Sequence, residues 1–189
     1  MRVRADRAPR VSSDPVSVKT EIVLAHPPEK LWNDLMFYEQ VPDPPPLLLR
    51  LLLPAPERAE GCGSDVGDET RCVYKTGYLI KRLVEVDRER YCRFDVVEQA
   101  LKMPGKIRLI GGSYTLRALS DGATRIQAET RYVSLRRPSW LWRPIEAAVC
   151  HAFHRHILAA IGRAGRTERG RSGAAASQPL RQNLAARNR

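Results

Sequence analysis

The sequence predicts an α+β fold in which a curved antiparallel sheet wraps around one long C-terminal helix, and two patterns carry that prediction. Between Pro138 and Gly165, apolar residues recur every three or four positions, the spacing that places side chains on one face of an α-helix. Between residues 69 and 135, several strand-like runs follow one another with no long helical pattern between them. A two-faced helix must bury its apolar side, so we expect the sheet to cover it.

The N-terminal part predicts one strand and two short helices. Residues 16–25 alternate apolar and polar side chains, as in a half-buried strand. His26-Pro27-Pro28 ends this strand, and Glu29 to Phe37 continues at helical spacing. Leu47 to Leu53, with the sequence LLLRLLL, is too short for a membrane span and fits a second short helix. Residues 55–68 are rich in Gly, Pro and acidic residues and are expected to form a loop.

Five antiparallel strands are expected after this loop, because polar turn signals separate runs that alternate in polarity. Their expected ranges are Glu69 to Lys75, Tyr78 to Val86, Tyr91 to Gln99, Lys106 to Leu119 and Thr124 to Leu135. The Gly111-Gly112 pair is expected to bend or bulge the fourth of them.

The long helix is expected to bury one face and to expose the other. The expected buried face consists of Leu141, Ile145, Ala148, Val149, Ala152, Phe153, Ile157, Ala160, Ile161 and Ala164. The expected exposed face consists of Arg143, Glu146, His151, His154, Arg155 and Arg163.

Composition indicates one domain with basic tails. The chain has 189 residues, 43% of them hydrophobic, which suits a single core. We expect a disordered tail over residues 1–14, the domain over residues 15–165, and a second disordered tail over residues 166–189. The net charge is +11, but the tails carry +2 and +5 and leave only +4 for the domain. No nucleic-acid recognition motif is visible, so we expect no specific nucleic-acid partner and at most weak membrane-surface contact.

Location and redox state follow from the termini and the cysteines. The N-terminus lacks a signal-peptide core, and no apolar run reaches the ~18 residues of a membrane span, so a cytoplasmic protein is expected. The four cysteines form no CxxC pair, which favours reduced thiols that act as small hydrophobic side chains.

The order of strand, two short helices, antiparallel strands and long helix resembles the helix-grip fold of the START and birch-pollen-allergen (SRPBCC) superfamily. The resemblance rests on VSVKTEIVLAHPPEKLWNDL, GGSYTLRALSDGATRIQAETRY and HAFHRHILAAIGRAG, and it covers roughly residues 15–165. Within the superfamily, the chain is most similar to bacterial polyketide cyclase/dehydrase and lipid-transport members. The resemblance implies an internal apolar cavity for a hydrophobic small molecule, such as a lipid, a sterol or a polyketide, and implies no cofactor.

Seven residues are candidates for lining such a cavity, because they fall on strand or helix faces expected to point inward: Tyr74, Phe94, Glu98, Tyr114, Leu116, Tyr132 and Phe153. Glu98 is also a weak candidate for a catalytic acid or base, because burial beside Phe94 and Val96 would raise its pKa. A polar anchor or a structural role is the alternative for Glu98. The tyrosines are equally consistent with an ordinary core.

Two further groups have alternative interpretations. Cys150, His151, His154 and His156 crowd one helix, but a helical pair supplies two ligands where zinc needs three or four, so no metal is expected. Trp140 and Trp142 fit either a cover for the open end of the sheet or, with LLLRLLL, a gate or an interfacial anchor.

Two functions follow from these patterns, and the sequence does not choose between them. The first is a noncatalytic carrier of a hydrophobic ligand, favoured because no set of nucleophile, base and orienting group is visible. The second is a cyclase or dehydratase of the polyketide type, in which Glu98 and Tyr114 would move protons. A membrane-surface accessory protein that uses LLLRLLL and the basic tail is a third hypothesis. The ligand, any reaction and the oligomeric state stay undetermined at this stage.

Overall fold

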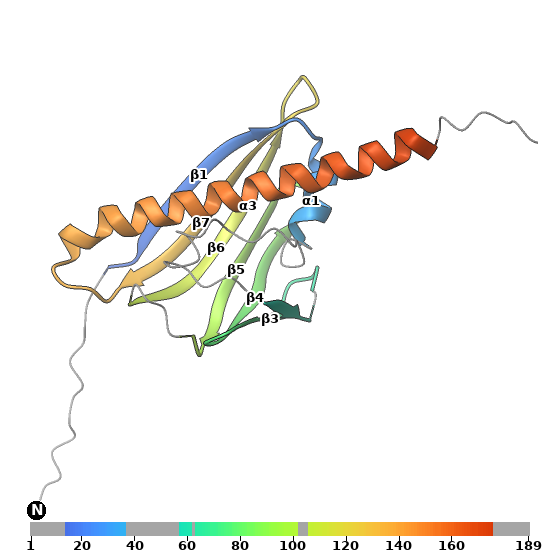
Figure 1. Cartoon of the computed structure of the whole chain (residues 1–189). Coiled ribbons are helices and arrows are strands. Elements are labelled where there is room, and N and C mark those ends of the chain that lie inside the picture. The colour runs from blue at the N-terminus through green and yellow to red at the C-terminus, as the bar shows by residue number, and fades with distance from the viewer. Residues whose placement is uncertain (1–13, 37–56, 62, 102–105, 176–189) are drawn as a thin grey trace, which may run out of the picture.

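The computed structural model describes residues 14–36, 57–61, 63–101 and 106–175, and these form one antiparallel sheet and two helices. The strands are β1 Val16–Leu24, β2 Arg58–Glu60, β3 Glu69–Tyr74, β4 Gly77–Asp87, β5 Tyr91–Gln99, β6 Ile107–Ala118 and β7 Thr124–Ser134. The helices are α1 Pro28–Met36 and α3 Ser139–Ala175. The sheet has the order β1-β7-β6-β5-β4-β3-β2, and α3 crosses its hollow side (Figure 1).

The predicted α+β architecture is confirmed. All five strands predicted between residues 69 and 135 are present, as are the first strand and the first short helix. One strand was not predicted. Arg58–Glu60 lies in the stretch expected to be a loop, but it pairs with β3. The predicted helix Leu47 to Leu53 lies outside the described residues.

The core forms where α1 and α3 meet the hollow side of the sheet. Its buried members come from α1, three strands and the C-terminal half of α3: Leu31, Trp32, Leu35, Cys92, Leu116, Ile126, Ala128, Ile157, Leu158 and Ile161. Helix α1 follows β1 directly, and its Leu31 and Leu35, four residues apart, share the face that packs inward. We call the hollow side of the sheet the interior face.

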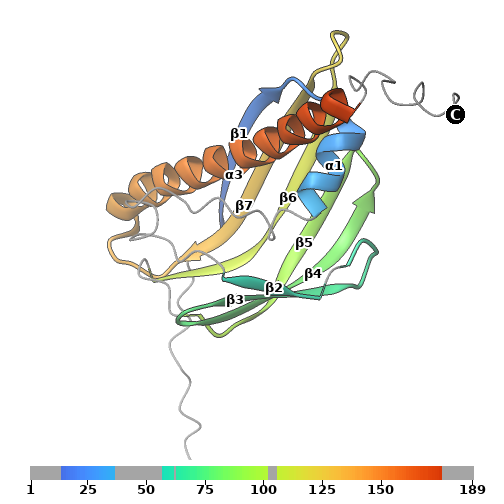
Figure 2. The same ribbon diagram turned by 45° about the vertical axis from the view of Figure 1, so that its right-hand side comes forward.

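Helix α3 covers only part of the interior face. Its main sheet contacts are with β1 and β7. Figure 2 shows β4 and β3 curving away from the helix at the other side of the sheet. The interior side of β3 and β4 therefore lies beside α3 rather than beneath it.

The expected faces of the long helix are partly wrong. His154, predicted to be exposed, is buried at 3% exposure, whereas Leu141 and Ile145, predicted to be buried, are 45% and 49% exposed. The apolar positions drift around the helix along its length. The set near Ile157 to Ile161 packs against α1 and the sheet, which leaves the earlier set facing solvent.

The long helix also extends further than predicted. It runs to Ala175, so residues 166–175 are helical where a disordered tail was expected. Neither described helix combines the length and hydropathy that a membrane span requires.

Candidate functional site

Three aromatic side chains on the interior face are only half buried. Phe94 lies two residues after the core residue Cys92, and Tyr114 lies two residues before the core residue Leu116, so both point to the interior side. Their ring centroids are 6.4 Å apart. Phe153 of α3 and Tyr114 both pack against the edge of the core. We call Phe94, Tyr114 and Phe153 the aromatic group.

Gly112 makes room for this group. It pairs with Phe94 across β5 and β6, and an added Cβ would lie 2.8 Å from Phe94 Cζ and 2.4 Å from the Glu129 carbonyl oxygen. The ladder between β6 and β7 shifts register between Leu109 and Gly111, so the predicted irregularity at the glycine pair is present. On the other side of Phe94, Lys81 Nζ lies 5.2 Å from the ring centroid.

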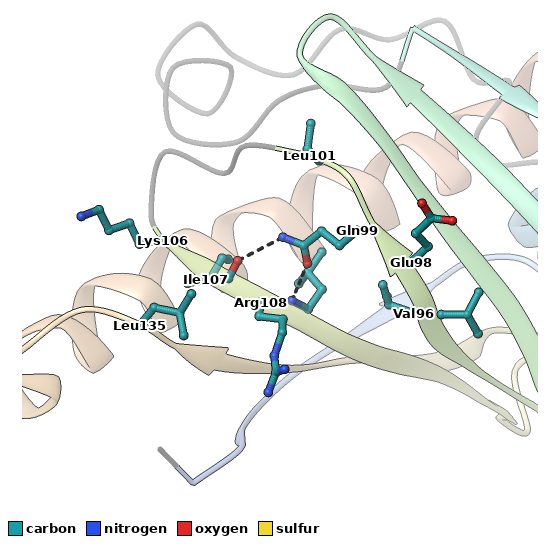
Figure 3. Close-up of a pocket in the computed structure, with 10 residues that line it drawn as sticks. Val96, Glu98, Gln99, Leu101, Lys106, Ile107, Arg108 and Leu135 are labelled. Atoms are coloured by element: carbon teal, nitrogen blue, oxygen red, sulfur yellow. Dashed lines mark hydrogen bonds between the residues drawn. The ribbon is translucent and has the colours of Figure 1, made fainter. Parts of the chain in front are cut away.

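A pocket opens where β5 and β6 diverge. Their ladder ends at Asp95 and Gly111. Beyond this point, the side chain of Gln99 links the two strands in place of backbone hydrogen bonds (Figure 3). Gln99 Nε2 donates to the Ile107 carbonyl oxygen at 3.1 Å, and the Leu109 amide donates to Gln99 Oε1 at 2.9 Å. The pocket has a volume of about 560 Å³. Its walls are Val96, Val97, Glu98, Gln99, Leu101, Lys106, Ile107, Arg108, Leu109 and Leu135.

Glu98 does not share a face with Phe94 and Val96. Val96 pairs with Lys81, but Glu98 pairs with the adjacent residue Ile80, because a bulge intervenes on β5. Neighbouring residues of β4 point to opposite sides, so Glu98 lies on the outer face. It is exposed and accepts a hydrogen bond from Tyr78, which raises the pKa of that phenol. The burial on which an acid or base role for Glu98 depended is therefore missing.

A buried polar cluster joins α3 to β1 and β7. Thr20 Oγ1 lies 2.8 Å from His151 Nδ1 and 2.9 Å from His154 Nδ1, and Thr130 Oγ1 lies 2.8 Å from His154 Nε2. The single Thr20 hydroxyl proton can serve only one imidazole, so the other Nδ1 must carry its own proton. Burial, followed by the neighbouring His151, lowers the pKa of His154 to about 4. His154 is therefore neutral at pH 7.

Two buried side-chain oxygens lie near the start of α3, one on Tyr132 of β7 and one on Glu146 of the helix itself. The Tyr132 hydroxyl and Glu146 Oε2 are buried and have no hydrogen-bond partner among the described residues. Glu146 Oε1 accepts a hydrogen bond from Ser134 at 2.8 Å. Burial and then the charge of Glu146 raise the pKa of Tyr132. A hydrogen-bond interaction with Glu146 also raises the pKa of Tyr132, so the phenol and the carboxylate face each other in the interior.

The thiols of the described residues are buried or half buried. Cys72, Cys92 and Cys150 are free, and burial raises the pKa of Cys92 and of Cys150 to about 11. Cys62 lies outside the described residues. Within the described ranges, no three His, Cys, Asp or Glu side chains are placed to hold a metal ion.

The structure brings some of the predicted site residues together and separates others. Phe94 and Tyr114 form a ring pair, and Tyr114 and Phe153 both pack against the core that contains Leu116. Tyr132 lies on the interior face of β7, in the neighbouring row of the sheet, whereas Tyr74 ends β3, two strands from Phe94.

Sequence reasoning missed Gln99, Glu146 and Thr20 as parts of this region, and it predicted the irregularity at Gly112 but not its place beside Phe94. Of the three missed residues, only Thr20 had a signal in the sequence. A hydroxyl side chain on an otherwise apolar strand face requires a polar partner, and two histidines on the covering helix supply it.

Comparisons with known proteins support the fold. Neither a family model nor a curated protein matches the sequence. Among solved structures, the Zhui aromatase/cyclase from a Streptomyces species is 16% identical, with a TM-score of 0.55, 81% of this chain covered and 95% of the other. Ara h 8.0201 is 14% identical, with a TM-score of 0.52 and coverage of 82% and 99%. A norcoclaurine synthase point mutant from Thalictrum is 16% identical, with a TM-score of 0.52 and coverage of 85% and 99%.

These structures share the element order and the curved sheet of this chain. The chain therefore has the helix-grip fold of the START and birch-pollen-allergen superfamily, as its sequence predicted.

Proposed function

We propose that this chain binds a hydrophobic small molecule of lipid, sterol or polyketide type against the interior face, in the cytoplasm. The observation that carries the proposal is the aromatic group. Phe94, Tyr114 and Phe153 point to the interior of the fold, yet each is only half buried. Interior aromatic surface that the described residues leave partly exposed is surface that an apolar ligand would cover.

The position of α3 supports the same proposal. Because the helix packs mainly on β1 and β7, the described residues leave part of the interior side of β4 to β6 uncovered, and we expect the ligand to lie there. The hydrophobic gain is about 25 cal/mol per Å² of apolar area removed from water, and part of it is lost to the cost of association. We therefore expect a dissociation constant of roughly micromolar order.

Proteins of the same fold lend further support. One of the solved structures is an aromatase/cyclase, and another is a norcoclaurine synthase in complex with a transition-state analogue. Both names point to small-molecule chemistry on this fold. Their identity to this chain is 16% in each case, so the proposal for this chain rests on its own interior face.

Tyr132 and Glu146 would anchor the polar end of the ligand. A ligand hydroxyl that reached this pair would accept a hydrogen bond from the Tyr132 phenol or donate one to Glu146 Oε2, in place of the interaction between the two side chains. This arrangement favours ligands that carry at least one hydroxyl group on an apolar skeleton.

The alternative is a cyclase or dehydratase of the polyketide type, and the same pair of residues is the observation that favours it. A buried carboxylate beside a phenol is able to shuttle a proton at a bound chain, whereas the exposed Glu98 is not placed to do so. Under this alternative, Glu146 and Tyr132 take the roles that the sequence assigned to Glu98 and Tyr114.

Titration with an apolar fluorescent probe tests ligand binding. Phe94→Ala and Tyr114→Ala should each weaken probe binding about tenfold or more, because each removes aromatic contact area at the centre of the proposed site. Val23→Ala, a truncation of an exposed valine on the outer side of β1, is the matched control and should leave the dissociation constant unchanged. Equal affinities in all four proteins, or no binding by the unmodified chain, would contradict the proposal.

A further inference from the structure

The first turns of α3 present an apolar stripe to solvent. Trp140 is 73% exposed, Leu141 is 45% exposed and Ile145 is 49% exposed. Pro144 and Ala148, on the same side of the helix, are exposed as well. Helices of globular proteins normally direct such a stripe into the core, whereas this one lacks a cover among the described residues.

The stripe begins only a few residues after the end of β7. Seven large hydrophobic side chains are exposed among the described residues, and four of them, Leu135, Trp140, Leu141 and Ile145, fall within this short stretch. The other three, Val23, Val66 and Val97, are far apart in the sequence. Figure 1 shows the start of α3 at the end of the molecule opposite α1.

Cations surround the stripe. Arg137 and Arg143 are exposed, and the Arg136 guanidinium stacks 4.1 Å from the centroid of the Trp142 ring. The Leu135 amide donates to the Lys106 carbonyl oxygen at 2.9 Å, which brings the exposed Lys106 to the same end of the sheet. No acidic residue occurs between positions 135 and 145. The nearest along the helix, Glu146, is half buried and accepts a hydrogen bond from Ser134.

We propose that this surface, formed by Leu135, Trp140, Leu141 and Ile145 with Arg137 and Arg143, docks the protein on an anionic lipid membrane. The composition of this surface matches both chemical regions of such a membrane, the charged headgroups and the apolar acyl chains. Tryptophan and aliphatic side chains enter the boundary between headgroups and acyl chains, while arginines contact the lipid phosphates. A nucleic acid would satisfy the arginines but would leave the exposed leucines and isoleucine in water.

The docking is interfacial, and it does not depend on ligand binding at the interior face. The stripe covers only the first turns of α3, and the same helix packs on β1 and β7 further along, so the helix would lie on the surface of the bilayer rather than cross it. The membrane surface and the aromatic group are separate regions, so each can be tested without the other.

Flotation of the full chain with vesicles tests the inference. Phosphatidylcholine vesicles that contain about one third phosphatidylglycerol should carry the protein upward at about 0.1 M salt, and vesicles of pure phosphatidylcholine should carry much less. Ile145→Glu should lower the partition coefficient about tenfold or more. Val66→Glu is the matched control, because it places the same charge at a 62% exposed valine elsewhere, and it should partition like the unmodified chain.

Further arms separate the membrane from other partners. Arg143→Ala should reduce partitioning about fivefold, the contribution of one cation near an anionic surface. Vesicles with brominated acyl chains should quench the fluorescence of the unmodified chain more than that of Trp140→Ala. Equal flotation of Ile145→Glu and Val66→Glu would overturn the inference, because the basic tails alone would then explain the binding. Failure of the unmodified chain to float would also overturn the inference. Duplex DNA binding that Ile145→Glu abolishes would then favour a nucleic acid, and self-association that Ile145→Glu abolishes would favour a second copy of the chain.

Discussion

Acidification below pH 6.5 is expected to destabilise the fold by up to about 3 kcal/mol through His154 alone. Burial and the neighbouring His151 lower the pKa of His154 from 6.5 to about 4. Between these two values the unfolded chain binds a proton that the folded chain does not. The contribution of neutral His154 to the free energy of unfolding is therefore fully present above pH 6.5, and it is lost progressively as the pH falls toward 4.

Urea unfolding at several pH values measures this effect. Between about pH 6 and 5 the free energy of unfolding should fall by roughly 1 kcal/mol per pH unit. This window lies above the titration of Glu129. Burial acts to raise the pKa of Glu129, but the hydrogen bond from Ser17 and the charge of Lys19 lower it on balance. His154→Gln should flatten the dependence, whereas His156→Gln, a change on the same helix outside the Thr20 cluster, should keep it. A steep dependence in His154→Gln would contradict the assignment.

Leu158→Ala is expected to cost about 2 to 5 kcal/mol of stability, the range for truncating a buried leucine. Leu158 is fully buried where α3 meets the core, so the substitution leaves a cavity between the helix and the sheet. Arg155→Ala, three residues earlier on the exposed side, should change stability by less than about 0.5 kcal/mol. The comparison is made by chemical denaturation at pH 7. Similar losses in both variants would mean that the faces of α3 are assigned wrongly.

The strands and their faces were predictable where pairing is regular. On β1, β6 and β7 the alternation of polar and apolar residues places Ile22, Leu116 and Ile126 inward, and the structure agrees. On β5 the alternation fails after Val96, because a bulge adds one residue and moves Glu98 to the outer face. A bulge depends on the partner strand β4, and β5 contains no glycine to signal it.

The long helix shows a different limit. Its apolar residues cover more than one side, so periodicity alone does not say which set is buried. Packing against α1 and β1 buries Ile157, Leu158 and Ile161. It also places His154 in the interior, where His154 forms a hydrogen bond with Thr20. The sequence predicted that Phe94, Tyr114 and Phe153 face inward, because each lies at a regularly spaced position of its strand or helix. The incomplete burial of the aromatic group depends on where α3 lies over the sheet, and that position follows from tertiary packing.

The most direct test of a ligand site at the interior face is an NMR titration of the full chain with a saturating apolar probe. The account predicts that aromatic and methyl resonances of Phe94, Tyr114, Phe153 and the adjacent Val86 shift, while those of the exposed Val23 do not. Shifts confined to Trp140, Leu141 and Ile145 on the outer side of α3, or no shift at the aromatic group, would contradict it.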